Sequence, residues 1–575
     1  MSMEEQQLTL IAERVDDIPI LSASTDRMGL AELFDGHLVP HGNWQGISPG
    51  KMLTGWLIHI LSEGDHRLNW VQDWAAQRLE TLRSSLGVEV CALDFSDDRL
   101  AMGLDMLADD EIWALLEADL NRRSLRVYDL KAKRVRIDTT SCSGYWEVSE
   151  DGLFQFGHSK DHRPDLPQFK VLLASLDPLG MPVATQMMGG EKADDPLYIP
   201  AIDQVRSGLG VRGLLYIGDC KMMSFETRAH LEVGGDDYLG PFSWTQVSQE
   251  ILDSYLQSVW TAEQALTTVK RRVNGKLVKI AEGFERCVML TATVADKEII
   301  WVERQLVIHS FAHARAAEAG LQSRIQRAHS AIAALNERKQ GKERFIAAEP
   351  LRQAAQAILK QHDVEGLLEL QIDEQVQERH VRKHKERPAE TRFDRQFSVT
   401  VLRDEPAIQA AIRRLGWRIY GTNAPAEELS LEQAVLAYRD EYLVEHCFGR
   451  LKGKPLSLTP MYLQDDRRAT GLTRLLSIGL RVLTLLEHVV RSHLAEQGEK
   501  LSGLYAGNPT RATDRPTTEA MLRSFKGISL SFVSVGGQTY RHITPLSPLQ
   551  KNILTLLDLP ESIYTRLAMD FENPP

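Results

Sequence analysis

The sequence predicts an α/β core that is preceded by an all-α domain and interrupted by a largely helical insertion. Three observations lead to this prediction. Apolar residues recur at helical spacing up to about residue 125, alternate with polar residues from residue 134, and return to helical spacing between residues 321 and 335. The 575 residues suffice for about four domains of average size, so several hydrophobic cores can form.

Composition and charge exclude several classes of protein. Hydrophobic residues make up 43% of the chain and charged residues 25%, as in globular proteins and unlike disordered or collagen-like chains. The formal net charge of −12 lowers the expectation of a polyanionic partner, but a basic patch is a local property. No run of about 18 uncharged apolar residues occurs. The start, MSMEEQQLTL, lacks the features of a signal peptide, so we expect a cytoplasmic protein.

The N-terminal 125 residues are predicted to form a helical domain. Ser48 and Pro49 fit the N-cap and first position of a helix, and Ile112, Leu116 and Leu120 recur at helical spacing. The next segment, residues 121–136, carries seven Lys and Arg residues against one Asp. Such a segment is either a solvated linker and strand edge or a surface that contacts phosphates.

Residues 126–240 are predicted to form the first part of the α/β core. Val135, Ile137 and Thr139 alternate with polar residues, as on a strand with one buried face. The apolar strands FKVLLASLD and MPVATQMM follow, joined by a turn at residues 177–180. After a helix near residues 196–207, the short strand GLLYIGD ends at Asp219. The predicted order is strand, hairpin, helix and strand.

The second half of the chain is predicted to complete this core around an insertion. We assign residues 241–410 to an insertion domain, 411–460 to the second part of the core and 461–575 to a C-terminal helical domain. The apolar seam from Leu321 to Leu335 fits a helical hairpin, a short coiled coil, or a helix packed within its own domain. A long helix is expected from residue 431 to about 451, and a second from 461 to about 496.

Two aspartates stand where strands rarely carry a charge. Asp138 interrupts the strand VRIDTT, and Asp219 ends the strand LLYIGD. Each residue alone fits a turn at a strand end. Two such residues in one α/β sheet, however, are typical of a ligand site, because ligands bind at the carboxyl ends of the strands. Carboxylate oxygens suit Mg²⁺ or Mn²⁺, which a third acid would help to hold.

The predicted helix after residue 431 offers that third acid. Tyr438, Glu441, Glu445 and Lys452 follow one another at steps of three, four and seven residues, which keeps them on or near one helical face. An ordinary exposed charged face would give the same pattern.

At this point the sequence resembles a known family, the DDE transposases of the insertion-sequence-four superfamily. Their glutamate helix reads Y-x2-R-x3-E-x6-K, which this chain matches at Tyr438, Glu445 and Lys452, whereas Glu441 stands at the arginine position. That departure affects one expected contact with a terminal DNA phosphate. Residues 157–170, GHSKDHRPDLPQFK, resemble a segment common in one branch of the family, and the helical first hundred residues resemble its N-terminal domain.

The resemblance implies a fold, a cofactor and an activity. The fold would be an RNase-H-like mixed sheet, with Asp138 on its first strand, Asp219 on its fourth and Glu445 on a later helix. These three acids would hold two Mg²⁺ ions, for which Mn²⁺ could substitute. The enzyme would cut transposon ends at terminal inverted repeats and join the freed 3′-hydroxyls to target DNA, as a homodimer or higher oligomer associated with the bacterial nucleoid.

Several residues are candidate DNA contacts. The family pattern assigns Tyr438 and Lys452 to this role, and the N-terminal domain is expected to bind DNA or dimerise. Lys160, Arg163 and Lys170 fit DNA-facing groups of the 157–170 segment, for which a solvated loop is the alternative. Basic residues also gather at 121–136, which includes Arg134 and Arg136, and at 379–395 and 450–454. We expect these segments to converge on the three acids.

Two other functions fit the same residues. One is a catalytically silent, transposase-derived DNA-binding regulator. The other is a metal-dependent nuclease with an RNase-H-like fold, which would cut DNA without joining it to a target. A purely structural coiled-coil protein is favoured only by the seam at 321–335.

Overall fold

The computed structural model describes residues 9–40, 42–273, 275–337, 345–381, 390–535 and 538–569. It divides into two compact units. The first consists of Met1–Gly240, Leu290–Trp301 and Ala437–Pro575, and the second of Pro241–Met289 and Val302–Leu436. The basic residues predicted within 382–389 lie outside the described part of the chain.

The sheet of the first unit has the order β4-β3-β2-β5-β6. β2 runs antiparallel to β3, and β3 antiparallel to β4, whereas β5 runs parallel to β2 and β6 parallel to β5. The strands are β2 (Arg134–Ser143), β3 (Gln168–Asp177), β4 (Met181–Gly189), β5 (Leu215–Gly218) and β6 (Asp237–Pro241). This mixed α/β arrangement confirms the predicted order of strand, hairpin, helix and strand and is consistent with an RNase-H-like core.

Helices join the parallel strands, as parallel pairing requires a crossover. α8 (Tyr198–Leu209) lies between β4 and β5 in the chain, and α9 (Phe225–Val233) between β5 and β6. Every residue of β3 is buried, so both faces of the sheet are covered at that strand. β2 is also buried on most of both faces, so the expectation of a single buried face is wrong for this strand: Arg136 alternates with the apolar residues but is buried against Asp177. β3 appears in the sequence as an almost continuous apolar run.

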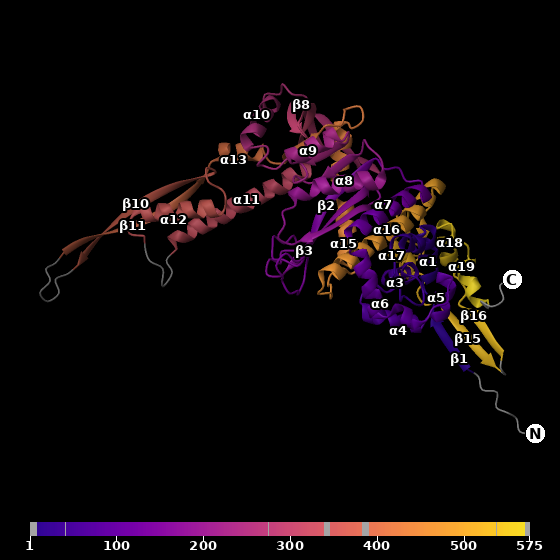
Figure 1. Ribbon diagram of the computed structural model, residues 1–575. Helices are drawn as coiled ribbons and strands as arrows, with labels where there is room; N and C mark the ends of the chain where they lie inside the picture. Colours follow the sequence, from indigo (N-terminus) through magenta and orange to yellow (C-terminus); the bar gives the residue numbers. More distant parts are fainter. Residues whose placement is uncertain are drawn as a thin grey trace, which may run out of the picture. The chain divides into compact units, whose positions relative to one another are not determined.

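Helices from the two ends of the chain pack together in the first unit (Figure 1). α16 (Asp466–Gln497) contacts α3, α6 and β4, so the C-terminal part completes the core of the N-terminal helices. The N-terminal helices are α1 (Ile18–Arg27), α2 (Leu30–His37), α3 (Pro49–Glu63), α4 (Val71–Ala76), α5 (Leu79–Leu86), α6 (Asp97–Leu107) and α7 (Asp110–Val127). A small sheet, β1-β15-β16, also joins the two ends: β1 (Thr9–Arg14), β15 (Ser529–Val535) and β16 (Gln538–Ile543).

One helix has the length and composition of a membrane span. Among the described residues only α16 meets that criterion, and 94% of its most apolar stretch is buried inside the protein. It is followed by the short helices α17 (Thr518–Arg523), α18 (Pro548–Leu556) and α19 (Ser562–Thr565).

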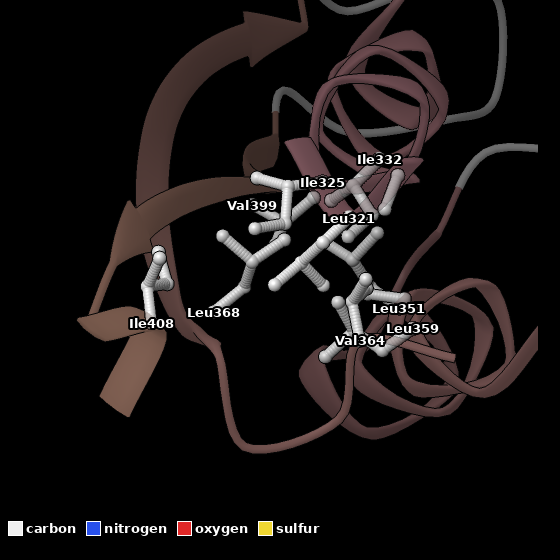
Figure 2. Packing of buried hydrophobic residues seen from close by; sticks show 11 residues of the cluster. Leu321, Ile325, Ile332, Leu351, Leu359, Val364, Leu368, Val399 and Ile408 are labelled. Atoms are coloured by element: carbon white, nitrogen blue, oxygen red, sulfur yellow. The ribbon is translucent and has the colours of Figure 1, made fainter. Parts of the chain in front are cut away.

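The second unit contains the expected helices together with long strands. Its apolar seam Leu321, Ile325, Ala328 and Ile332 is buried, but it packs against α12 and the β10–β11 pair rather than in a coiled coil (Figure 2). One group of strands has the order β12-β9-β8-β7, and all of it except residues 290–301, where β8 ends and β9 begins, belongs to this unit: β7 (Thr267–Val273), β8 (Lys276–Val294), β9 (Lys297–Ser310) and β12 (Trp417–Thr422). The remaining elements are α10 (Gln249–Trp260), α11 (Phe311–Ala333), α12 (Ala348–Gln361), β10 (Leu368–Val381), β11 (Glu390–Arg403) and α13 (Glu405–Ile412).

The long helix expected from residue 431 to 451 is two helices, which corrects the sequence prediction. α14 covers Leu431–Arg439 and α15 covers Tyr442–Lys452. Between them Asp440 and Glu441 bond to carbonyl groups three residues back, those of Ala437 and Tyr438. Such tighter turns interrupt the α-helical repeat, so spacing along one regular helix no longer places Tyr438 relative to Glu445.

Candidate active site

The parallel pairing of β2 and β5 brings the two predicted aspartates to one place. Ile137 of β2 is opposite Gly218 of β5, so Asp138 and Asp219 follow directly on paired residues. Gly218 is required here, because a Cβ on it would lie 2.7 Å from the sulfur of Met222. The sequence prediction of two acids at one edge of the sheet therefore describes the observed geometry.

Local hydrogen bonds fix the carboxylate of Asp219. Its Oδ1 accepts the backbone N–H of Lys221 at 2.9 Å, which forms a turn at the end of β5. The hydroxyl of Tyr198, on α8, donates to the same oxygen at 2.7 Å. Burial and the neighbouring Asp219 charge raise the pKa of Tyr198 well above its ordinary value, so this hydroxyl stays a proton donor.

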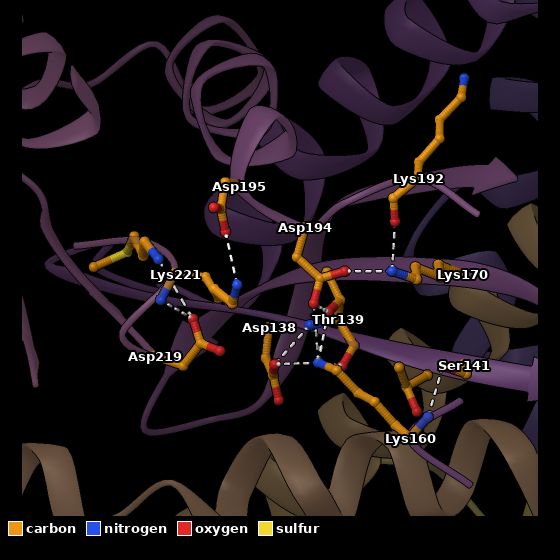
Figure 3. Close-up of polar contacts among 12 residues, drawn as sticks. Asp138, Thr139, Ser141, Lys160, Lys170, Lys192, Asp194, Asp195, Asp219 and Lys221 are labelled. Carbon is orange, nitrogen blue, oxygen red and sulfur yellow. Dashed lines mark hydrogen bonds and ion pairs between the residues drawn. The ribbon is translucent and has the colours of Figure 1, made fainter. Parts of the chain in front are cut away.

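Asp138 is half-buried and faces a lysine. Its Oδ1 accepts the backbone N–H of Thr139 at 2.7 Å and lies 3.5 Å from Nζ of Lys160 (Figure 3). Burial raises the pKa of Asp138, and the charge of Asp219 raises it further, whereas the Lys160 ammonium opposes both effects. The Lys160 charge therefore offsets only part of the cost of holding a negative charge on Asp138.

A third carboxylate in the same cavity is that of Glu441. Asp138, Asp219, Tyr438 and Glu441 line a cavity of about 20 Å³, which has room for one water molecule or one ion. Burial raises the pKa of Glu441, and the charges of Asp138, Glu445 and Asp219 add to that effect. The sequence places Glu441 on the same helical face as Glu445, but its position at the arginine of the family pattern suggested no metal-binding role for it.

Glu445, the predicted third acid, lies close to this group but does not line the cavity. It lies in the first turn of α15 and, like Glu441, is an exposed residue; its charge acts on Glu441. α15 packs on β2, and Cys447 donates from its thiol to the carbonyl of Gly180 at 3.0 Å, which attaches the helix to the β3–β4 turn. The structure thus places Asp138, Asp219 and Glu441 around one cavity, whereas Glu445 is outside its lining but close enough for its charge to act on Glu441.

The segment 157–170 contacts both α15, which carries Glu445, and β2, which carries Asp138. Lys452 of α15 donates to Asp161 at 2.5 Å and to the carbonyl of Ser141 in β2 at 2.8 Å. On the other side, Lys170 donates to Asp194 at 2.8 Å. Although burial opposes it, this bond and the charges of Lys160 and Lys170 hold the pKa of Asp194 below its ordinary value.

Two predicted DNA contacts are corrected by their burial. Arg136 is only 4% exposed, donates to Asp177 at 2.8 Å and bonds to the carbonyl of Ala437. Lys170 is 6% exposed and bound to Asp194. Both charges are neutralised inside the protein and present no surface to a phosphate.

The other predicted contacts differ in their exposure. Arg163 is exposed and pairs with its neighbour Asp165, Arg134 is half-buried, and Lys452 binds Asp161. Arg450 of the 450–454 segment is buried against Glu487. Arg379 and Arg395 belong to the second unit, so the expected convergence of all basic segments on the acids stays a prediction.

The donor chemistry of the site fits a hard divalent cation. Asp138, Asp219 and Glu441 offer carboxylate oxygens around one small cavity, and Glu445 stands beside it. No group of three acid, His or Cys side chains among the described residues is already arranged around one metal position. Closure around an ion would therefore need side-chain movement.

The sequence analysis also missed Asp194 and Tyr198. Asp194 belongs to the run Ala193-Asp194-Asp195-Pro196, which is typical of a helix start and suggests no other role. In the structure it accepts from Thr139 at 3.2 Å as well as from Lys170. Its partners come from β2 and β3, so only the folded sheet reveals the contact.

Comparisons with known proteins give limited information. Residues 10–118, which contain most of the N-terminal helices, match a family described as a domain of unknown function, DUF4277. No curated relative matches the chain. Among solved structures, the cryo-EM structure of the piggyBac transposase synaptic complex with hairpin DNA is similar at 9% identity and a TM-score of 0.33, over 86% of this chain and 79% of that one. At that TM-score the similarity carries no argument.

Proposed function

We propose that the protein is a DNA transposase of the DDE class, related to the insertion-sequence-four superfamily. The observation that supports this most strongly is the position of two aspartates side by side, on the first strand of the core sheet and directly after the fourth. The glutamate-helix pattern at Tyr438, Glu445 and Lys452 and the segment 157–170 support the same proposal.

Asp138, Asp219 and Glu445 are the proposed metal-binding and catalytic residues. Two Mg²⁺ ions, or Mn²⁺ in their place, would supply Lewis-acid stabilisation of the attacking and leaving oxygens when bound. The chain itself positions the reactants: β2 and β5 fix the two aspartates, and Tyr198 orients the Asp219 carboxylate. In-line phosphoryl transfer depends mainly on such positioning and electrostatic stabilisation, with no covalent enzyme intermediate.

The proposed substrates are double-stranded terminal inverted repeats and target DNA, bound by a homodimer or higher oligomer in the cytoplasm. Donor ends would be cut to free 3′-hydroxyls, which then attack the target. Tyr438, Lys452, Lys160, Arg163 and Arg134 remain the proposed DNA contacts, while Arg136 and Lys170 are withdrawn because they are buried.

A cleavage assay on DNA that carries an inverted-repeat end tests the proposal. We expect Mg²⁺-dependent cleavage by the wild-type protein and a loss of about 10³-fold or more for Asp138→Asn or Asp219→Asn, with end binding in a mobility-shift assay retained. Asp165→Asn is the matched control, because this exposed carboxylate pairs with Arg163 away from the cavity. Cleavage by Asp138→Asn at the wild-type rate would refute the proposal.

Two further outcomes separate the alternatives. A precut end that is joined to plasmid DNA identifies a transposase, whereas cleavage without joining identifies a nuclease. Specific end binding without any cleavage identifies a silent regulator.

A further inference from the structure

Lys160 is the cation closest to the proposed catalytic aspartate Asp138. Its Nζ lies 3.5 Å from Oδ1 of Asp138 and 3.7 Å from Oδ2 of Asp194. The same ammonium donates to the carbonyl of Thr139 at 2.7 Å and to its hydroxyl at 2.6 Å. Figure 3 shows the lysine reaching along β2 towards both carboxylates. One cation thus stands between two acids of the site.

Backbone contacts also fix this lysine. Its own N–H donates to the hydroxyl of Ser141 on β2 at 3.2 Å. The Ser159 hydroxyl accepts the backbone N–H groups of Asp161 and Arg163, each at 3.2 Å, which holds the loop on either side of Lys160. With both the main chain and the ammonium attached to β2, the charge is held beside Asp138 rather than free in solvent.

We propose that Lys160 is a tethered cation that partly offsets the charge of Asp138 in the metal-free protein and competes with a divalent ion for that carboxylate. This inference rests on the proposed function, because it assumes that Asp138 binds a metal. An ammonium group has three donors and no acceptor, so it can give up Asp138 and still bind Thr139 and Asp194. Asp194 therefore offers the lysine a second anionic partner when the ion arrives.

The position of Lys160 also links the two acid-bearing elements. Asp161, the next residue, binds Lys452 of α15, the helix that carries Glu445. Lys160 is therefore directly adjacent in the chain to the residue that contacts α15, so a movement of Lys160 away from Asp138 would start next to that contact. The charge of Lys170 on Asp194 limits how far Lys160 can shift, since that carboxylate already accepts a second cation.

Metal binding to the full-length protein tests this role without relying on activity. We would titrate Mn²⁺ by isothermal calorimetry into wild type and into Lys160→Met, Asp138→Asn and the double variant. Removing a like charge beside the ion should tighten Mn²⁺ binding by Lys160→Met on the order of tenfold. The double variant should lose this gain, because it lacks the carboxylate for which lysine and metal compete.

Two control variants test whether the effect on Mn²⁺ affinity depends on a positive charge at residue 160 or on any positive charge in the same loop. Arg163→Met removes a cation from the same loop, but one that pairs with Asp165, and should change Mn²⁺ affinity by less than about twofold. Lys160→Arg keeps the charge and should bind Mn²⁺ as weakly as wild type. Lys160→Gln gives the same loss of charge should the Met variant fail to fold.

The outcomes distinguish this inference from the proposed function. If Mn²⁺ binding depends on Asp138 but is unchanged or weaker in both Lys160→Met and Lys160→Gln, the tethered-cation role is overturned and the transposase proposal stands. If binding does not depend on Asp138, both are overturned. Asp138-dependent binding that tightens in Lys160→Met, in a protein without cleavage or joining activity, supports the inference and refutes the transposase.

Discussion

Two glutamates near the start of α15 are candidates for the third carboxylate, and separate substitution of each decides between them. Glu441 lines the cavity with Asp138 and Asp219, whereas Glu445 occupies the glutamate position of the family pattern outside its lining. The replacements Glu441→Gln and Glu445→Gln keep the size of each side chain and remove its charge. We expect Glu445→Gln to be the more damaging.

The size of each effect follows from the position of the residue. Loss of a metal-binding carboxylate removes a direct ligand, and we expect cleavage to fall about 10³-fold or more in Glu445→Gln. A residue that supports the ligands costs about 10–100-fold when removed. The cavity of about 20 Å³ has room for a single ion. If the Glu445 side chain moves to bind that ion, Glu441 is a supporting residue, and its loss should cost the smaller factor.

The assay is single-turnover cleavage of a labelled inverted-repeat end at saturating protein, with Mn²⁺ affinity measured in parallel. Glu496→Gln on α16 is the matched control, because it removes the same charge from an exposed side chain that does not line the cavity. A loss of more than 10³-fold in Glu441→Gln together with near wild-type cleavage by Glu445→Gln would refute the reasoning. The third carboxylate would then be Glu441, and the family match of this helix would fail at its central residue.

Three further predictions concern stability, measured by denaturant and thermal unfolding. Glu117→Gln should cost about 3–5 kcal/mol, because it removes the negative charge 2.6 Å from the fully buried Arg481 guanidinium, and adding Arg481→Met should restore most of that loss. Burial lowers the pKa of His59 from 6.5 to about 3, so the unfolded chain takes up a proton below pH 6.5 that the folded chain refuses. Stability should fall by roughly 3 kcal/mol between pH 6.5 and 4, and His59→Leu should flatten that slope; an unchanged slope contradicts the assignment. Gly471→Ala should destabilise by about 1–3 kcal/mol, because its Cβ would lie 2.1 Å from the Leu104 carbonyl, whereas Gly449→Ala, with open space around it, should stabilise by about 0.5–1 kcal/mol.

The core sheet could be predicted because its signals are local. The alternation around Ile137, the turn at Asp177–Gly180 and the apolar strand before Asp219 each depend on neighbouring residues only. Dependence on neighbouring residues also explains why the prediction of one long helix after residue 431 was wrong. Asp440 and Glu441 fit a helical repeat as well as any charged pair, and nothing in their immediate sequence specifies a break.

The β10–β11 pair of the second unit could not be predicted for a different reason. Its strands carry Glu, Gln and Arg on exposed faces, as at Glu374 and Arg395, which form an ion pair across the two strands. Strands without one buried face lack the period-two signal on which sequence reasoning depends. Leu368 and Val399 are buried at the base of the pair, where it packs on α11 and α12, and only there does the pattern become apolar.

Burial of basic residues reduces the positive charge that the first unit can present to DNA. Arg136, Lys170 and Arg450 were counted as surface charges, but each neutralises an acid inside the first unit: Asp177, Asp194 and Glu487. These pairs add nothing to the net charge of −12, and counting their bases as surface charge overstates the positive charge available to a phosphate.

Some basic residues of the first unit remain exposed and are candidates for DNA contact. Lys131 and Lys133 lie directly before β2, and Arg163 lies in the segment that meets Asp138 through Lys160. All three belong to the unit that contains the acids, so a DNA path across them needs no assumption about the second unit. If DNA follows this path, Lys131→Ala and Lys133→Ala should weaken end binding at low salt more than at high salt, since exposed lysines act on phosphates through counterion release.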